Sequence, residues 1–175
     1  MSRRDDWKLY DRQLLTTSSI DDIQDDSKMR RGLPSAHEKY DVAQVINSAN
    51  YIYFLAQQQL LDLPGDRQLQ AFQIFNEEIL NLHRGQGMEL YWRETSQPPS
   101  EADYLQMISN KTGGLFRLIL RLLQCCSSRT DIDVSKLVEV IGLEFQILDD
   151  LKNLCDETVS LLHLLEACAS EILTA

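Results

Sequence analysis

The chain has 175 residues, enough for one domain with a hydrophobic core. A composition of 43% hydrophobic and 25% charged residues suits a soluble globular protein, and a net charge of −10 argues against a nucleic-acid partner, which favours a basic face. No stretch is apolar over a length that spans a membrane, and the N-terminus lacks the apolar core of a signal peptide. The four cysteines match no zinc-binding spacing, so we expect free thiols in a reducing compartment, the cytoplasm.

The first part of the chain is predicted to be helical after a polar start. Residues 1–13 form a polar N-terminal extension, and a first helix over 14–30 carries an acidic cluster. Gly32 and Pro34 are expected to end this helix, because both residues fall at breaks in the apolar periodicity. A long second helix is predicted from Glu38 to Leu61, where apolar residues recur at helical spacing.

The middle of the chain also indicates helices joined by short breaks. Residues 63–66 predict a turn, and a helix follows over 67–90. Residues 96–99 read as a loop, and Ser100 is placed to cap the next helix, over 101–127.

The last predicted helix begins between Asp131 and Ser135 and runs to about Leu154. The preceding helix is expected to be interrupted at Gly113-Gly114, and no segment shows convincing strand alternation. We therefore expect an all-α fold, with one domain over 14–154 and a divergent apolar tail over 155–175.

Two acidic clusters share one spacing and are the strongest sign of function. Each places oxygen-bearing side chains at positions i, i+1 and i+4, as Asp21, Asp22 and Asp25 and as Asp149, Asp150 and Asn153. On a helix, positions i and i+4 lie on one face, roughly 6 Å apart. Two such faces directed at each other can hold divalent cations and a polyphosphate, because Mg²⁺ prefers carboxylate and phosphate oxygens. A solvated acidic helix face stays open as the alternative for the first cluster, whereas the apolar neighbours of the second cluster argue against it.

Basic and polar residues near the clusters suit phosphate recognition. Lys28, Arg30 and Arg31 follow the first cluster closely, and arginine binds phosphate in a bidentate manner. Their alternative role is ordinary surface charge or pairing with Asp26. Lys111 precedes Thr112 and two glycines, but the segment lacks the earlier glycine of a P-loop, so we expect a lysine that lines a helical cavity. The three histidines form no ligand spacing, and no catalytic residue is assigned beyond metal and diphosphate ligands; His83 could lie in the core or in a cavity.

Several segments in register carry a resemblance to one enzyme family. The chain resembles trans-isoprenyl diphosphate synthases of the polyprenyl synthetase family, and most of all eukaryotic, fungal geranylgeranyl diphosphate synthases. The segments that carry it are 21–32, 34–37, 46–51, 82–93, 111–116 and 145–150. The resemblance implies an isoprenoid-synthase helical bundle with a central cavity, here incomplete because the chain is expected to be truncated at both ends relative to the family.

The resemblance also implies the metal site. It makes Asp21, Asp22 and Asp25 the ligands of the first motif, with Asp149 the ligand of the second motif and Asp150 in support. Together they would hold two or three Mg²⁺ ions with the diphosphate, as Lewis acids and as a template for the leaving group.

The same resemblance implies the substrates. Arg30, Lys111, Thr112 and Gln146 would contact an allylic diphosphate, and Arg31 would contact isopentenyl diphosphate. The implied reaction joins isopentenyl diphosphate to the allylic cation left when the diphosphate departs.

The expected product is geranylgeranyl diphosphate. Thr16 and Thr17 lie about one helical turn before Asp21, where a bulky aromatic side chain would block a growing prenyl chain. Because threonine is small, the sequence favours a product longer than farnesyl diphosphate.

Both ends of the chain depart from the family pattern. Leu14 stands where family members place a histidine, and Cys155–Ala175 lacks the expected lysines. An active synthase is therefore weighed against a catalytically impaired paralogue that pairs with a full-length synthase, and against a class I terpene cyclase. The Asp149-Asp150 pair argues against the cyclase. The expected assembly is a homo-oligomer or a pairing with a full-length synthase.

Overall fold

The computed structural model describes residues 19–30, 32–127 and 133–155. Within these ranges the chain is helical apart from two short strands and the connections, which confirms the predicted all-α class. Residues 19–24 are helical and are followed by β1 (Met29–Arg30), β2 (Leu33–Pro34), α2 (Ala36–Lys39), α3 (Val42–Gln58), η1 (Gln59–Asp62), α4 (Gly65–Thr95), α5 (Glu101–Cys126) and α6 (Ser135–Cys155).

Some sequence predictions fall on residues that lie outside the described ranges. They include the polar extension over 1–13, almost all of the apolar tail over 155–175, and the candidate site residues Thr16, Thr17 and Arg31.

The first predicted helix is wrong beyond residue 24. Asp26 adopts φ 51°, a left-handed conformation that aspartate tolerates better than most residues, and the helix ends there. The chain then forms a small antiparallel hairpin in which Met29 lies opposite Pro34, with Gly32 at φ 79° in its turn. The expectation of no strand is therefore wrong for β1 and β2, and Gly32 shapes a hairpin turn instead of ending a helix.

Other helix boundaries also differ from those predicted from the sequence. The predicted helix from 38 to 61 is divided at Tyr40 and Asp41, both of which are extended, so α2 and α3 are separate. The predicted turn at 63–66 is shorter than expected, because α4 begins at Gly65. The loop before α5 and its cap are confirmed, since the Asp103 amide donates to Ser100 Oγ at 3.2 Å.

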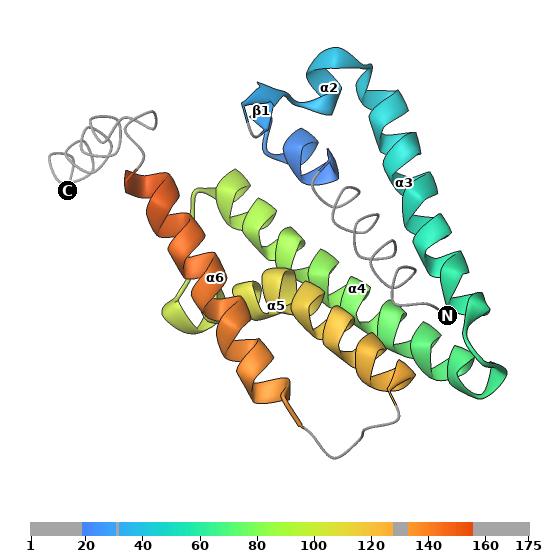
Figure 1. Cartoon of the computed structure of the whole chain (residues 1–175). Coiled ribbons are helices and arrows are strands. Elements are labelled where there is room, and N and C mark those ends of the chain that lie inside the picture. The colour runs from blue at the N-terminus through green and yellow to red at the C-terminus, as the bar shows by residue number, and fades with distance from the viewer. Residues whose placement is uncertain (1–18, 31, 128–132, 156–175) are drawn as a thin grey trace, which may run out of the picture.

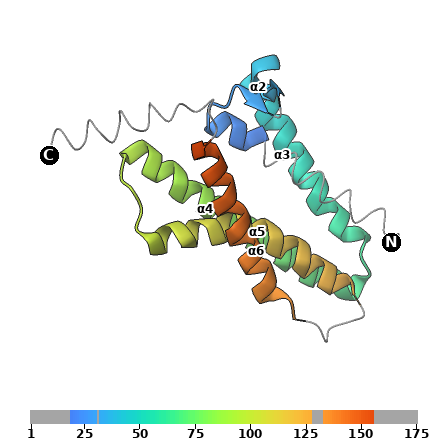
Figure 2. The ribbon, with the colours of Figure 1, turned by 60° about the vertical axis from the view of Figure 1, so that its left-hand side comes forward.

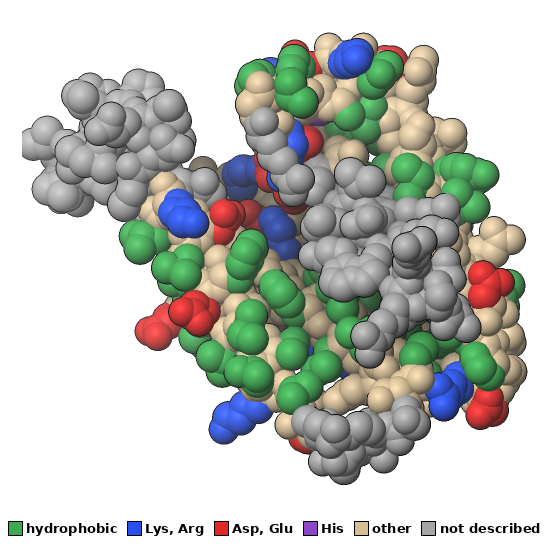
Figure 3. Space-filling model, in the orientation of Figure 1, with side chains coloured by type: hydrophobic (Ala, Val, Ile, Leu, Met, Phe, Trp, Pro, Cys, Tyr) green, Lys and Arg blue, Asp and Glu red, His purple; other side chains and the backbone are tan. Residues whose placement is uncertain are grey.

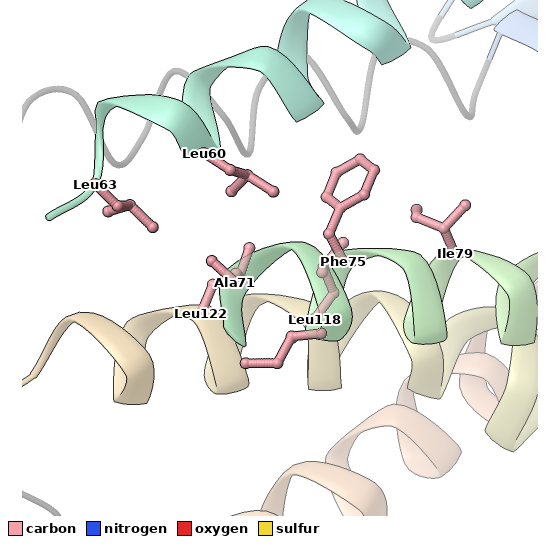
Figure 4. Packing of buried hydrophobic residues seen from close by; sticks show 8 residues of the cluster. Leu60, Leu63, Ala71, Phe75, Ile79, Leu118 and Leu122 are labelled. Carbon is pink, nitrogen blue, oxygen red and sulfur yellow. The ribbon is translucent and has the colours of Figure 1, made fainter. Parts of the chain in front are cut away.

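The bundle is built on α4, α5 and α6. Helix α4 packs against α5, and α5 packs against α6, which crosses it steeply (Figures 1 and 2). The hydrophobic core lies between α4, α5 and the end of η1 (Figure 4) and contains Leu60, Leu63, Ala71, Ile74, Phe75, Ile79, Leu118 and Leu122. The Tyr53 ring of α3 meets Phe75 edge to face at 5.7 Å, which ties α3 to this core.

Glycines set the close approach of the helices. A Cβ built on Gly85 would lie 2.5 Å from the backbone nitrogen of Lys111, so α4 and α5 touch backbone to backbone there. Likewise a Cβ on Gly142 would lie 3.2 Å from Cα of Gly113. The predicted interruption at Gly113-Gly114 is wrong, because α5 runs straight through both residues and uses them for packing.

A buried carboxylate links α4 to α5 beside these glycines. Glu78 is 2% exposed and accepts from Arg117 Nε at 3.1 Å and from Arg121 Nη1 at 2.6 Å. Paired on both sides, this charge is accommodated in the helix interface.

Helix α6 carries apolar side chains on its outer side (Figure 3). Exposed members include Leu137, Val140, Ile141, Phe145, Leu148 and Leu151. No helix in the described part of the chain combines the length and the hydropathy needed to cross a membrane.

Candidate functional site

The first acidic cluster lies where the helix over 19–24 gives way to a turn. The amide of Asp25 donates to the carbonyl oxygen of Asp21 at 2.9 Å, so the i, i+4 relation continues one residue past the helix. Asp22 is buried, with 4% of its surface exposed, whereas Asp21 and Asp25 keep a quarter or more of their side chains accessible. Asp21 and Asp25 are therefore the two carboxylates that a ligand can reach.

The carboxylates of this cluster pair with cations from three other elements, β1, α4 and α5. Asp22 accepts from Arg30 of β1, at 2.8 Å from Nε and 2.5 Å from Nη2. Asp21 Oδ1 lies 3.4 Å from Lys111 Nζ of α5. These contacts bring Arg30 and Lys111, predicted from sequence as site residues, to the cluster.

Lys111 is shared between two carboxylates. Its Nζ donates to Glu89 Oε2 at 2.5 Å and lies farther from Asp21. Burial alone lowers the pKa of Lys111, but the charges of Asp21 and Glu89 outweigh burial and the pKa is raised. The pKa of Asp21 is also raised, chiefly by burial, and the charges of Asp25 and Glu89 add to this rise while Lys111 opposes it.

Two accessible carboxylates one helical turn apart, Asp21 and Asp25, suit a hard cation. Magnesium is commonly held by one or two carboxylates, several waters and substrate phosphates. Within residues 19–30, 32–127 and 133–155, no three acidic, histidine or cysteine side chains lie close enough to ligate one ion. If a magnesium ion binds here, Asp21 and Asp25 would supply two of its ligands, and water and substrate oxygens would have to supply the others.

The second acidic cluster is organised by a chain of hydrogen bonds between α5 and α6. Tyr104 donates to Asp150 Oδ2 at 2.5 Å, and Gln146 Nε2 donates to Asp150 Oδ1 at 2.8 Å. Thr112 in turn donates its hydroxyl to Gln146 Oε1. Both oxygens of Asp150 are thus occupied, while Asp149 is exposed. Burial and the bond to Asp150 raise the pKa of Tyr104 to about 12, so this tyrosine remains a donor at neutral pH.

The two clusters lie at the same end of the molecule. Figures 1 and 2 place residues 19–24, the C-terminal end of α4 and the C-terminal end of α6 together at that end. In Figure 3 acidic and basic side chains gather in the same region. The arrangement gathers carboxylates and cations from five elements at this end of the bundle, which suits an anionic ligand bound through divalent cations.

The sequence prediction missed three residues of this site. Glu89 and Arg93 occupy positions i and i+4 near the end of α4, a spacing that could have drawn attention to them within segment 82–93. Tyr104 carried no such signal, because its role depends on how α5 meets α6. His83 is exposed, and its Nδ1 lies 2.9 Å from the carbonyl oxygen of Ile79, so the structure gives it a place on the surface.

The helical bundle, with two acidic clusters at one end, is the kind of fold and site that the sequence led us to expect, and the comparison with known families tests this expectation. Residues 14–161 match the family described as polyprenyl synthetase, and the chain belongs to this family.

The relatives narrow the comparison to fungal enzymes. The chain is 64% identical over 141 residues to a geranylgeranyl pyrophosphate synthase of Emericella nidulans, a match that covers 81% of this chain and 35% of the relative. It is 57% identical over 150 residues to one of Macrophomina phaseolina, covering 85% of this chain and 45% of the relative. It is 55% identical over 147 residues to one of Penicillium canescens, with shares of 83% and 43%. The resemblance inferred from the motifs is confirmed, and the matched region spans less than half the length of these relatives.

Proposed function

We propose that the protein acts in isoprenoid biosynthesis as a Mg²⁺-dependent prenyltransferase that condenses isopentenyl diphosphate with an allylic diphosphate to give geranylgeranyl diphosphate. The observation that carries the proposal is the pair Asp21 and Asp25, one helical turn apart and matched by Lys111 and Arg93. Three relatives that span more than this chain are named geranylgeranyl pyrophosphate synthases, which supports the choice of substrate class.

The metal is assigned to the accessible carboxylates. Asp21 and Asp25 of the first cluster and Asp149 of the second would hold it, with Asp150 in support. Asp22 is engaged by Arg30, so its contribution is to position that arginine beside the cluster. When bound, magnesium supplies Lewis-acid polarisation of the diphosphate and fixes the orientation of the leaving group.

The protein's own cations and polar groups hold the allylic substrate. Lys111 and Arg30 offer charged donors to the diphosphate, and Thr112 and Gln146 stand beside them in the hydrogen-bond chain to Asp150. Such preorganised donors favour the charge that builds up on the departing diphosphate. Arg31, outside the described residues, is proposed to bind isopentenyl diphosphate.

The bond changes follow from the substrates. The allylic carbon–oxygen bond breaks, and the diphosphate leaves with the electron pair. The double bond of isopentenyl diphosphate then attacks the allylic cation, the new carbon–carbon bond forms, and loss of a proton restores a double bond. An apolar surrounding shields the cation from water. Thr16 and Thr17, which also lie outside the described residues, are proposed to leave room for a geranylgeranyl chain.

The deciding experiment is incubation of the 175-residue chain with labelled isopentenyl diphosphate, an allylic diphosphate and Mg²⁺. Elongated prenyl diphosphate supports the proposal. A cyclic hydrocarbon formed from geranylgeranyl diphosphate alone identifies a terpene cyclase instead. No turnover, together with co-purification of a full-length synthase, identifies a non-catalytic partner. Sedimentation of the chain alone tests whether it forms the homo-oligomer expected from the sequence.

A further inference from the structure

Arg93, in the last turn of α4, reaches across to the first acidic cluster. Its Nη1 donates to Asp25 Oδ1 at 2.7 Å, and its Nη2 donates to the carbonyl oxygen of Gln24 at 2.5 Å. The arginine and its partners are far apart in the sequence, so the fold creates this contact. The guanidinium thus lies directly beside one of the two carboxylates assigned to the metal.

The ion pair between Arg93 and Asp25 is more exposed to solvent than the neighbouring pair between Arg30 and Asp22. Side-chain exposure is 48% for Arg93 and 30% for Asp25, whereas the Asp22 side chain that binds Arg30 is only 5% exposed. Ion pairs open to water are weak and are readily exchanged for a stronger partner. Asp25 can therefore give up Arg93 for a divalent cation, while Asp22 stays with Arg30.

Such an exchange leaves Arg93 without its carboxylate at the point where an anion arrives. A carboxylate that ligates a dication no longer neutralises a guanidinium beside it, and the local charge becomes positive. A diphosphate bound to the same cation restores the balance, and the planar fork of arginine matches phosphate oxygens in a bidentate manner. The second anchor of Arg93, on the Gln24 carbonyl oxygen, keeps the side chain near the cluster during the change.

We propose that Arg93 is a further diphosphate-binding residue, which pairs with Asp25 in the ligand-free protein and transfers to the diphosphate when Asp25 takes up a magnesium ion. The inference rests on the proposed function, since it names an additional contact in the same site. The competing explanation is a purely structural tether that holds residues 19–24 against α4.

The two explanations predict opposite patterns in a binding experiment with Arg93→Gln. Calorimetry of the full chain measures the affinity for Mg²⁺ alone and then for inorganic diphosphate at a fixed Mg²⁺ concentration. If Arg93 transfers to the ligand, its loss frees Asp25, so binding of Mg²⁺ alone is unchanged or tighter. The affinity for diphosphate falls by about tenfold or more, because a charge-assisted hydrogen bond is lost. Arg93→Lys keeps the charge without the fork and restores part of the diphosphate affinity.

Arg84→Gln is the matched control, because Arg84 lies on the same helix, is exposed and donates only to Asn81 within the described residues. It should bind both ligands as the wild type does. Equal weakening of Mg²⁺ and diphosphate binding in Arg93→Gln identifies a tether and overturns the inference, as does wild-type behaviour for both ligands. Far-UV circular dichroism shows whether Arg93→Gln is folded. Arg93→Lys, which keeps the positive charge, provides a second variant if Arg93→Gln does not fold. If the wild-type chain binds no diphosphate with Mg²⁺, the proposed function itself is wrong, a result distinct from a silent Arg93→Gln.

Discussion

Gly85→Ala tests the crossing of α4 and α5 that places Lys111 in the site. A methyl group at Gly85 would lie 2.5 Å from the Lys111 nitrogen and 2.9 Å from its Cα, and these backbone atoms cannot rotate away. Overpacking of this kind costs about 1–3 kcal/mol. Replacing glycine by alanine inside a helix by itself stabilises by about 1 kcal/mol. The net effect is therefore a loss of up to about 2 kcal/mol, together with a shift of Lys111 away from Asp21.

Gly87→Ala isolates the steric contribution. Gly87 lies on the same helix, and a Cβ there meets nothing within 4 Å in the described structure, so only the gain in helix propensity of about 1 kcal/mol is expected. Urea unfolding followed by circular dichroism at a helix wavelength gives both values. Gly85→Ala should be less stable than Gly87→Ala by about 1–3 kcal/mol. If the two variants unfold at the same urea concentration, the backbone contact at Gly85 is not as described.

Three further changes test other parts of the molecule. Burial raises the pKa of Tyr53, whose hydroxyl has no hydrogen-bond partner among the described residues, so stability should be full below about pH 10 and fall above it. Tyr53→Phe should reduce this loss of stability at high pH and leave the stability at pH 7 unchanged, as measured by urea midpoints across pH. A lower urea midpoint at pH 7 would show that the Tyr53 hydroxyl does have a hydrogen-bond partner. Asp22→Asn should lower the free energy of unfolding by about 1–2 kcal/mol, because it weakens the hydrogen bond to Arg30. Asp26→Asn on the exposed turn should leave the urea midpoint unchanged, so equal midpoints for the two variants would contradict this prediction. In a catalytically competent version, Thr17→Phe should shorten the prenyl product on chromatography, and an unchanged product length contradicts the assignment.

Most of the helices could be predicted from the spacing of apolar residues in the sequence. The apolar spacing of α3, α4 and α5 is set by local sequence, and Ser100 marked the start of α5 correctly. The break at Asp26 could not be predicted, because a left-handed aspartate leaves no periodic signal. The glycines at 113 and 114 misled for the opposite reason, since helix packing uses their small size and not their freedom to bend.

Part of the candidate site could be predicted from local spacing, and part of it depends on contacts between segments that are distant in the sequence. Local spacing predicted that Asp21 and Asp25 lie one helical turn apart, and the structure also brings Lys111 and Arg30 to the first cluster. Their contact with a diphosphate stays a prediction. Arg93 depended on a contact between distant segments that no local pattern encodes. Likewise Tyr104 and the occupied oxygens of Asp150 emerged only from the crossing of α5 and α6.

The most direct test of the magnesium–diphosphate site is equilibrium binding of an unreactive allylic thiodiphosphate to the full chain. We expect binding that requires Mg²⁺, disappears with a chelator, and weakens at least about tenfold in Asp21→Asn, which removes one of the two accessible carboxylates of the first cluster. The exposed Asp66→Asn at the distant start of α4 should bind as the wild type does. Binding that is equally strong without Mg²⁺, or that is unchanged in Asp21→Asn, would show that Asp21 does not hold a magnesium ion that binds the diphosphate.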